Sequence, residues 1–290
     1  MCAYYRFWFP CQSIRTIATE AGKQLEVEFH SGSLLLRGEL YLSVRQPAPA
    51  ILVCHAMHAG GFRWLPLYRS FAEKASARGF ACLIFDFRGC GRSEGQFDYG
   101  WGEQEDARAA FEFLLNCNEV NPSRAFVVGR SLGGTIAVYA LARDFRVKGI
   151  ALWATPPDHH KNIRNFIVKR YGRLRYATFL LLSYLDSLHD LGKTSRIELF
   201  GLQLRLKDLR RKTMSLHSPT VLGVERAPVL LLLGDKDEYV TQQEIKDFEK
   251  AIDGKVRSQI LPNTGHTFKR AETSLIEATL GWFEELLKES

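Results

Sequence analysis

One serine in this sequence lies in a setting that favours nucleophilic chemistry. Ser131 follows the apolar run Ala125–Val128, is flanked by Gly129 and Gly133, and precedes a helix-compatible segment. A strand, a tight turn and a helix in that order form a nucleophile elbow when the turn holds Gly-x-Ser-x-Gly. Glycines two positions from the serine are needed because the strained turn leaves no room for a Cβ. The pattern predicts an accessible hydroxyl, with the N–H of Leu132 facing a developing oxyanion.

A serine hydroxyl is a weak nucleophile at neutral pH, so a base and an acid that orients the base are expected elsewhere in the chain. Later segments supply both. Asp235 and Asp237 follow the apolar run Val229–Leu233, and His266 follows the run Val256–Leu261. Groups that come directly after parallel strands meet at one edge of a sheet. We therefore expect His266 and one of the two carboxylates to lie beside the serine, where together they could perform acyl transfer.

An alternation of strands and helices must position these groups. Eight segments have the apolar content or the alternation of strands, and helix-compatible segments separate most of them. This order predicts an α/β fold with a mostly parallel sheet of about eight strands, flanked by helices and with the first hairpin at one edge. The expected strands are Gln24–His30, Leu34–Val44, Ala50–His55, Phe80–Phe87, Arg124–Val128, Val147–Trp153, Val229–Leu233 and Val256–Leu261.

The composition is that of an ordinary globular protein. With 290 residues, 46% of them hydrophobic and 24% charged, the chain can form one large domain with an insertion. No apolar run reaches the roughly 18 residues of a membrane span. About the first 20 residues form an aromatic extension that we expect to pack against the body of the protein. Six cysteines without a C-x-x-C pair indicate a reducing compartment, and we expect a cytoplasmic protein.

Residues 158–219 interrupt the alternation of strands and helices. This segment holds thirteen Lys and Arg against five Asp and Glu, so the net charge of +7 of the whole chain is concentrated there. We interpret residues 1–157 and 220–290 as the core and 158–219 as a helical cap. Its apolar stretch Tyr176–Leu188 is expected to lie over the serine and hold an acyl chain. His159 and His160, at the start of the segment, are expected to be solvated. The cations either attract phosphate or an anionic membrane, or they form a solvated surface. No readout motif for nucleic acid accompanies them.

Several fragments of the chain resemble the α/β-hydrolase superfamily. They are the Gly-x-Ser-x-Gly turn, Asp86–Ser93, Gly234–Val240 and His266, and the resemblance extends from about Gln24 to the C-terminus apart from the insertion. The chain is most similar to the capped branch of serine esterases, lysophospholipases and feruloyl-esterase-like enzymes.

The resemblance implies further site residues. The family pattern G-x-x-D-x-x-V selects Asp237 as the acid, and it implies an oxyanion hole made by the backbone N–H groups of Met57 and Leu132. Ala56 stands where the family usually has glycine. His55 and His58 have an H-x-x-H spacing but no accompanying carboxylate motif, so we expect structural hydrogen bonds and no metal site.

These observations predict a serine hydrolase that cleaves a small carboxylic ester through an acyl-enzyme. Ser131 would attack, His266 would transfer the proton and Asp237 would orient the imidazole. The substrate would be an acyl or aryl ester, and no cofactor is implied. Thioester hydrolysis, acyl transfer and amide cleavage are alternatives that the same groups support, as is a non-catalytic binding protein on the same fold. The sequence leaves the oligomeric state open.

Overall fold

The computed structural model describes residues 13–19, 22–189, 191, 195–213, 216, 227–252 and 256–289. Its main sheet has nine strands in the order β1-β2-β3-β5-β4-β6-β7-β10-β11. The strands from β5 to β11 in this order pair in parallel, whereas β1, β2 and β3 pair antiparallel at one edge. The strands are β1 (Ser13–Thr19), β2 (Gly22–Ser31), β3 (Leu34–Ser43), β4 (Ala48–Cys54), β5 (Ala81–Phe85), β6 (Val120–Arg130), β7 (Val147–Trp153), β10 (Val229–Gly234) and β11 (Val256–Leu261).

The predicted α/β fold with a mostly parallel sheet is confirmed, with one strand more than expected. Strand β1 lies within the stretch that we interpreted as an aromatic extension, and it pairs with β2. The aromatic residues of that extension lie outside the described residues. Strands β4 and β5 and the second half of β6 are almost continuously buried because helices cover both faces of the sheet.

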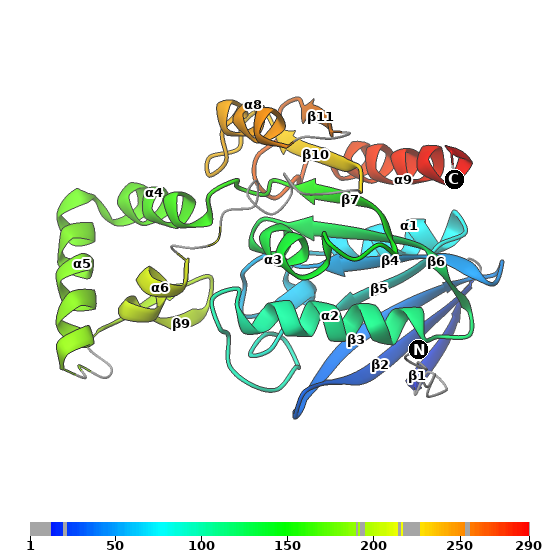
Figure 1. Cartoon of the computed structure of the whole chain (residues 1–290), viewed down its shortest axis with the longest axis horizontal. Coiled ribbons are helices and arrows are strands. Elements are labelled where there is room, and N and C mark those ends of the chain that lie inside the picture. Colours follow the sequence, from blue (N-terminus) through cyan, green and yellow to red (C-terminus); the bar gives the residue numbers. More distant parts are fainter. Residues whose placement is uncertain are drawn as a thin grey trace, which may run out of the picture.

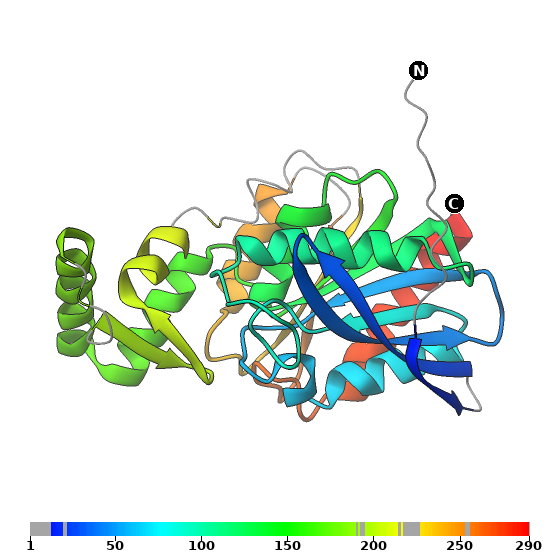
Figure 2. The same ribbon diagram turned by 90° about the horizontal axis from the view of Figure 1, so that it is seen from below.

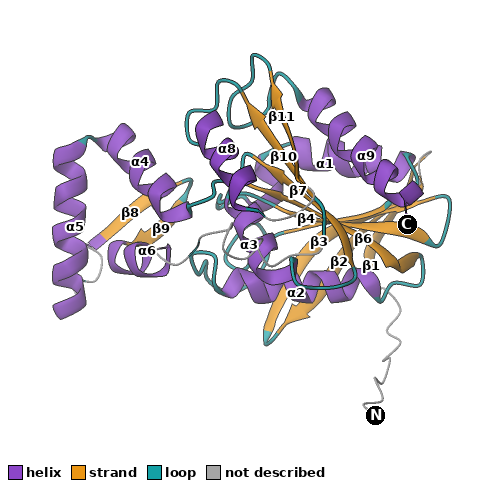
Figure 3. Ribbon diagram, turned by 45° about the horizontal axis from the view of Figure 1, so that its top comes forward, coloured by secondary structure: helices purple, strands orange, loops and turns teal. Residues whose placement is uncertain are grey.

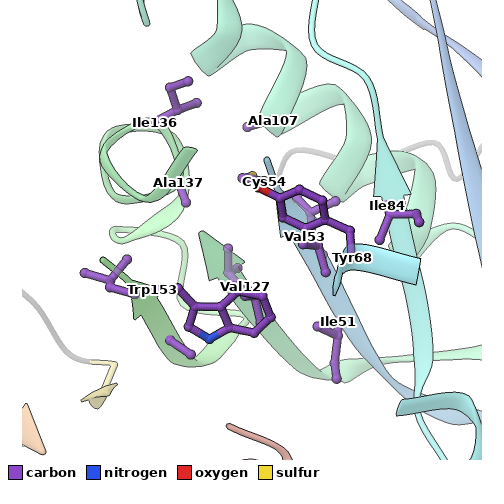
Figure 4. Close-up of a cluster of buried hydrophobic side chains, with 14 of the residues drawn as sticks. Ile51, Val53, Cys54, Tyr68, Ile84, Ala107, Val127, Ile136, Ala137 and Trp153 are labelled. Atoms are coloured by element: carbon purple, nitrogen blue, oxygen red, sulfur yellow. The ribbon is translucent and has the colours of Figure 1, made fainter. Parts of the chain in front are cut away.

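In the part of the chain that the structure describes, helices cover the two faces of the sheet (Figure 3). They are α1 (Leu67–Ala77), α2 (Gly102–Leu115), α3 (Leu132–Leu141), α8 (Gln242–Ala251) and α9 (Glu272–Glu289). Helices α1 and α9 pack against one another, and so do α2 and α3. Their buried side chains meet those of the strands in a single core, which includes Ile51 of β4, Val127 of β6 and Trp153 of β7 (Figure 4).

The described elements within residues 158–219 form a separate group beyond the carboxyl ends of β6 and β7 (Figures 1 and 2). Besides helices, this segment contains a β-hairpin that the sequence did not indicate. The described elements are α4 (His159–Tyr171), α5 (Arg173–Leu188), β8 (Arg196–Leu199), β9 (Leu202–Arg205) and α6 (Leu206–Thr213). None of the described helices is long and apolar enough to cross a membrane.

Hydrogen bonds and an ion pair connect the 158–219 segment to the loop before α2. The indole Nε1 of Trp101 donates a 2.7 Å hydrogen bond to the carbonyl oxygen of Lys212. The backbone N–H of Arg205 donates to the hydroxyl of Tyr99 at 2.8 Å, and Lys212 also forms an ion pair with Asp98. The 158–219 segment is therefore held at the edge of the sheet where parallel α/β proteins place their sites.

Helix α5 does not lie over Ser131, contrary to the expectation for the apolar stretch Tyr176–Leu188. Side chains of α4 and of the β8–β9 turn reach the pocket beside Ser131, and no α5 side chain lines it. Leu174, Leu181 and Leu188 of α5 face solvent instead. The sequence correctly indicated that α5 is apolar. It did not indicate which parts of the protein α5 contacts.

Candidate active site

The turn between β6 and α3 holds Ser131 in a backbone conformation that non-glycine residues rarely adopt, with φ 52° and ψ −125°. The two glycines that flank the motif lie against other backbone. A Cβ on Gly129 would come within 2.4 Å of the Cα of Gly134, and a Cβ on Gly133 within 2.2 Å of the carbonyl oxygen of His55. The start of α3 can therefore press against the end of β4 only because residue 133 has no side chain.

Ser131, His266 and Asp237 form a continuous hydrogen-bonded chain. The Oγ of Ser131 lies 3.2 Å from Nε2 of His266, and Nδ1 of His266 lies 2.9 Å from Oδ2 of Asp237. The Asp237 side chain is fully buried, and its Oδ1 accepts hydrogen bonds from the backbone N–H groups of Tyr239 and Val240. These two bonds fix the carboxylate, which in turn fixes the ring of His266.

The second candidate acid, Asp235, has a different position. Its Oδ1 accepts a 2.9 Å hydrogen bond from the backbone N–H of Thr264. Backbone N–H groups of Thr264 and Asn263 lower the pKa of Asp235, since hydrogen bonds to a carboxylate stabilise its charged form. Asp235 thus ties its own loop to the loop that carries His266, while Asp237 contacts the ring itself.

His266 is kept neutral by its surroundings. Burial lowers the pKa of His266, because the charged imidazolium loses its hydration. The carboxylate of Asp237 acts in the opposite direction, and the cation of Arg130 adds to the lowering. A neutral ring can accept a proton from Ser131 at pH 7, which is the protonation state that a general base needs.

The two expected oxyanion donors come shortly after the ends of two neighbouring parallel strands, β4 and β6. Met57 follows β4 and lines the pocket with Ser131, and Leu132 is the first residue of α3. The first N–H groups of a helix have no acceptor within it. The neighbouring N–H of Ala56 is engaged, because it donates a 2.9 Å hydrogen bond to the hydroxyl of Tyr68. Met57 is therefore better placed than Ala56 to donate to a substrate.

The two histidines of the H-x-x-H pattern make structural contacts. His55 is buried; its Nε2 accepts from the N–H of Phe87 at 3.1 Å, and burial lowers the pKa of His55 to about 4. His58 accepts from the N–H of Gly60 and stacks on Trp64. Among the residues that the structure describes, no group of three or more His, Cys, Asp or Glu side chains could hold a metal ion.

A pocket of about 200 Å³ opens beside Ser131. Helix α4 supplies one wall with His159, Ile163 and Phe166, and the turn of the β8–β9 hairpin supplies Phe200. Asp158 caps α4 by accepting from the N–H of Lys161, so the helix begins at His159. His159 is consequently buried in the wall of the pocket and is not solvated, contrary to expectation.

Aromatic side chains connect this wall of the pocket to Tyr239, which lies in the loop that carries Asp237. The rings of Phe166 and Phe200 lie 4.9 Å apart, and Phe166 lies 5.4 Å from Tyr239. Tyr239 in turn meets the ring of His266 edge-on at 4.9 Å. Asn162 donates to the carbonyl oxygen of Tyr239 at 2.5 Å. The 158–219 segment therefore contacts the loop that carries Asp237, and Tyr239 of this loop contacts His266.

Arg130 is a site residue that the sequence reasoning missed. Its side chain is 1% exposed, lines the pocket and donates through Nη2 to the carbonyl oxygen of His266 at 2.8 Å. It forms no ion pair with a carboxylate in the part of the chain that the structure describes, and its buried Nε has no partner there. The available signal was a charged residue shortly after the apolar run Ala125–Val128.

The position of Arg130 predicts a change in the pH profile. Arg130→Gln removes a cation that opposes protonation of His266, so the pKa of His266 should rise. The acidic limb of kcat/KM against pH should then move to higher pH, because the ring is protonated earlier as pH falls. Arg130→Lys keeps the charge and should leave the limb near its original position. Equal limbs in all three proteins would show that Arg130 acts through packing alone.

Comparison with known families decides the membership of this chain. The family model described as "Alpha/beta hydrolase family" matches residues 51–271. The chain belongs to the alpha/beta hydrolase family. The matched range includes the elbow, both carboxylates and His266, so the resemblance predicted from these motifs is confirmed at the level of the family.

Individual relatives of this alpha/beta hydrolase differ in how much they share with it. The quorum-quenching protein AidA of Acinetobacter baumannii is 34% identical over 131 residues, which are 43% of this chain and 42% of AidA. The structure of PA2218 from Pseudomonas aeruginosa has a TM-score of 0.74 at 18% identity and covers 98% of both chains. The Pyrococcus furiosus esterase Pf2001 has a TM-score of 0.67 at 17% identity, covering 92% of this chain and 91% of its own.

Proposed function

We propose that this alpha/beta hydrolase cleaves carboxylic esters through an acyl-enzyme on Ser131. The observation that carries the proposal is the chain of hydrogen bonds from Ser131 through His266 to Asp237, at the floor of a pocket. A hydroxyl, a neutral imidazole and a fixed carboxylate in this order are what nucleophilic acyl transfer requires. The fold of the esterase Pf2001 supports the same reaction class.

The proposed reaction has two halves. The Oγ of Ser131 bonds to the ester carbonyl carbon while Nε2 of His266 takes the proton of the hydroxyl. Asp237 stabilises the imidazolium that forms. The backbone N–H groups of Met57 and Leu132 donate to the carbonyl oxygen as it becomes an oxyanion. The C–O bond to the alcohol then breaks, and His266 gives its proton to the departing alkoxide. In the second half, a water molecule attacks the acyl-enzyme as His266 takes its proton. The bond between the acyl group and Ser131 then breaks, His266 returns the proton to the serine oxygen, and the carboxylic acid is released.

The 158–219 segment would act as the cap that selects the substrate, with 1–157 and 220–290 as the catalytic core. Phe166 and Phe200 present apolar surface to the pocket from this segment. An acyl or aryl group of a small ester would pack on these rings, since burial of apolar surface is worth about 25 cal/mol per Å². Helix α5 takes no part in this selection, because its apolar residues do not reach the pocket.

A serine-directed probe and an ester panel test the proposal. A fluorophosphonate should label the folded protein once, at Ser131, and Ser131→Ala should remain unlabelled. A panel of p-nitrophenyl esters of increasing chain length, with aryl esters and lysophospholipids, should reveal turnover of at least one carboxylic ester.

Three other outcomes have defined meanings. Faster turnover of a thioester or an anilide of the same acid would favour a thioesterase or a peptidase with the same three residues. Transfer of the acyl group to an added alcohol in preference to water would favour an acyltransferase. If the folded protein showed neither labelling nor turnover, the proposal would be refuted. A non-catalytic binding protein would then be the remaining interpretation.

A further inference from the structure

Helix α5 turns an apolar face to solvent. Six of the eleven large apolar side chains that are exposed in the described residues belong to this one helix. Leu174 is 84% exposed, Leu188 62%, Tyr184 60% and Leu181 58%. Contiguous exposed apolar surface on a folded protein marks an interaction site more often than single exposed residues do.

The exposed residues form a stripe along the helix. Leu174, Leu181 and Leu188 are spaced by seven residues, which is close to two full turns, so they lie one above another. The opposite face of α5 is directed inward, where Ser183 and Asp186 are buried. Figures 1 and 2 both show α5 at the edge of the molecule farthest from the sheet, and the side chains of the stripe are exposed.

The exposed charges on α5 itself have one sign. The only carboxylate of α5, Asp186, is buried and paired with Arg205, so the outward face carries no negative charge. Arg173 and Arg175 are exposed at the start of the helix, and they flank the stripe on its two sides by their helical positions. The segment that contains α5 has eight more basic than acidic residues.

We propose that α5 docks on a lipid bilayer that contains anionic lipids. An apolar stripe flanked by cations, on a helix too short and too polar to span, is the arrangement of an interfacial helix. The leucines enter the acyl region while Arg173 and Arg175 meet lipid phosphates. A second copy of the chain is a poorer occupant, because pairing two α5 stripes brings no carboxylate to the arginines.

Vesicle flotation tests this proposal without reference to catalysis. The vesicles are made from ether-linked phosphatidylcholine, alone or with about one third ether-linked phosphatidylglycerol, so they contain no carboxylic ester to hydrolyse. The wild-type protein should float with the anionic vesicles. Leu174→Ser, Leu181→Ser and Leu188→Ser combined should weaken binding on the order of 100-fold or more, since three buried leucine side chains are removed from the bilayer.

Two further variants make the result specific. Phe145→Ser removes an apolar residue that is 80% exposed outside α5, and it should float like the wild type. Arg173→Gln with Arg175→Gln should weaken binding to anionic vesicles by about tenfold or more and hardly change binding to neutral ones. Circular dichroism should show all variants folded, because none of these side chains is in the core.

Three results would overturn the inference. The wild type could fail to bind anionic vesicles, or Phe145→Ser could lose as much binding as the leucine variant. Sedimentation could also show a dimer that the leucine variant abolishes, with no vesicle binding by either protein; the stripe would then be an interface between copies. Each result can be obtained whether or not Ser131 hydrolyses esters.

Discussion

Replacing Ser131 with alanine is expected to lower kcat on an activated ester by about 10⁴- to 10⁶-fold. The variant removes the atom that bonds to the carbonyl carbon, and no other hydroxyl is hydrogen-bonded to His266 in the part of the chain that the structure describes. The fold should be unaffected, because alanine adds no atom and the hydroxyl is not part of the core. The measurement is turnover of a p-nitrophenyl ester by matched, purified proteins with superimposable circular dichroism spectra.

The residual rate in this variant is itself informative. Some acceleration over water should remain, since the oxyanion donors and the pocket still bind the ester. An unchanged kcat would exclude Ser131 as the nucleophile, and covalent labelling at another residue would then identify the replacement.

The second large effect separates two carboxylates that are two residues apart. Asp237→Asn should lower kcat by about 10⁴-fold, because an amide cannot hold His266 in the tautomer that accepts the proton of Ser131. Asp235→Asn replaces a carboxylate that contacts the backbone of Thr264 and not the ring, so its cost should stay below about tenfold. The two kcat values, measured on the same ester, give the ranking.

If Asp235→Asn cost more activity than Asp237→Asn, the loop that carries both carboxylates would have to rearrange when substrate binds. Thermal unfolding of both variants serves as the control. If Asp235→Asn lost activity together with a large fall in Tm, the cause would be the lost hydrogen bond between Asp235 and Thr264, which holds the two loops together. It would not be a catalytic role of Asp235.

The main features of the fold followed from local sequence patterns. The buried strands β4, β5, β7 and β10 and the second half of β6 were visible as apolar runs, because a parallel sheet covered by helices needs apolar side chains on both faces. The edge strand β1 was not visible, since an edge strand carries no such requirement. The β8–β9 hairpin was missed for a similar reason: its strands have four residues each, too few for a clear alternation.

The residues of the proposed triad could be found because each follows a strand that the sequence marks. The lining of the pocket could not. His159, Phe166 and Phe200 reach the site through the direction in which α4 and the hairpin leave the core, and this direction is set by tertiary contacts such as that of Asn162 with Tyr239. The composition of Tyr176–Leu188 likewise marked an apolar stretch, but it could not tell which of its residues contact protein and which face solvent.

The backbone of Ser131 has a consequence for how this chain can change. At φ 52° and ψ −125° the residue occupies a region that glycine enters freely and that costs other residues on the order of 1–3 kcal/mol. Glycine at this position would relieve that strain and abolish the proposed chemistry in one step. Variants selected for heat resistance alone would therefore drift toward losing the nucleophile, and only selection for turnover would retain it.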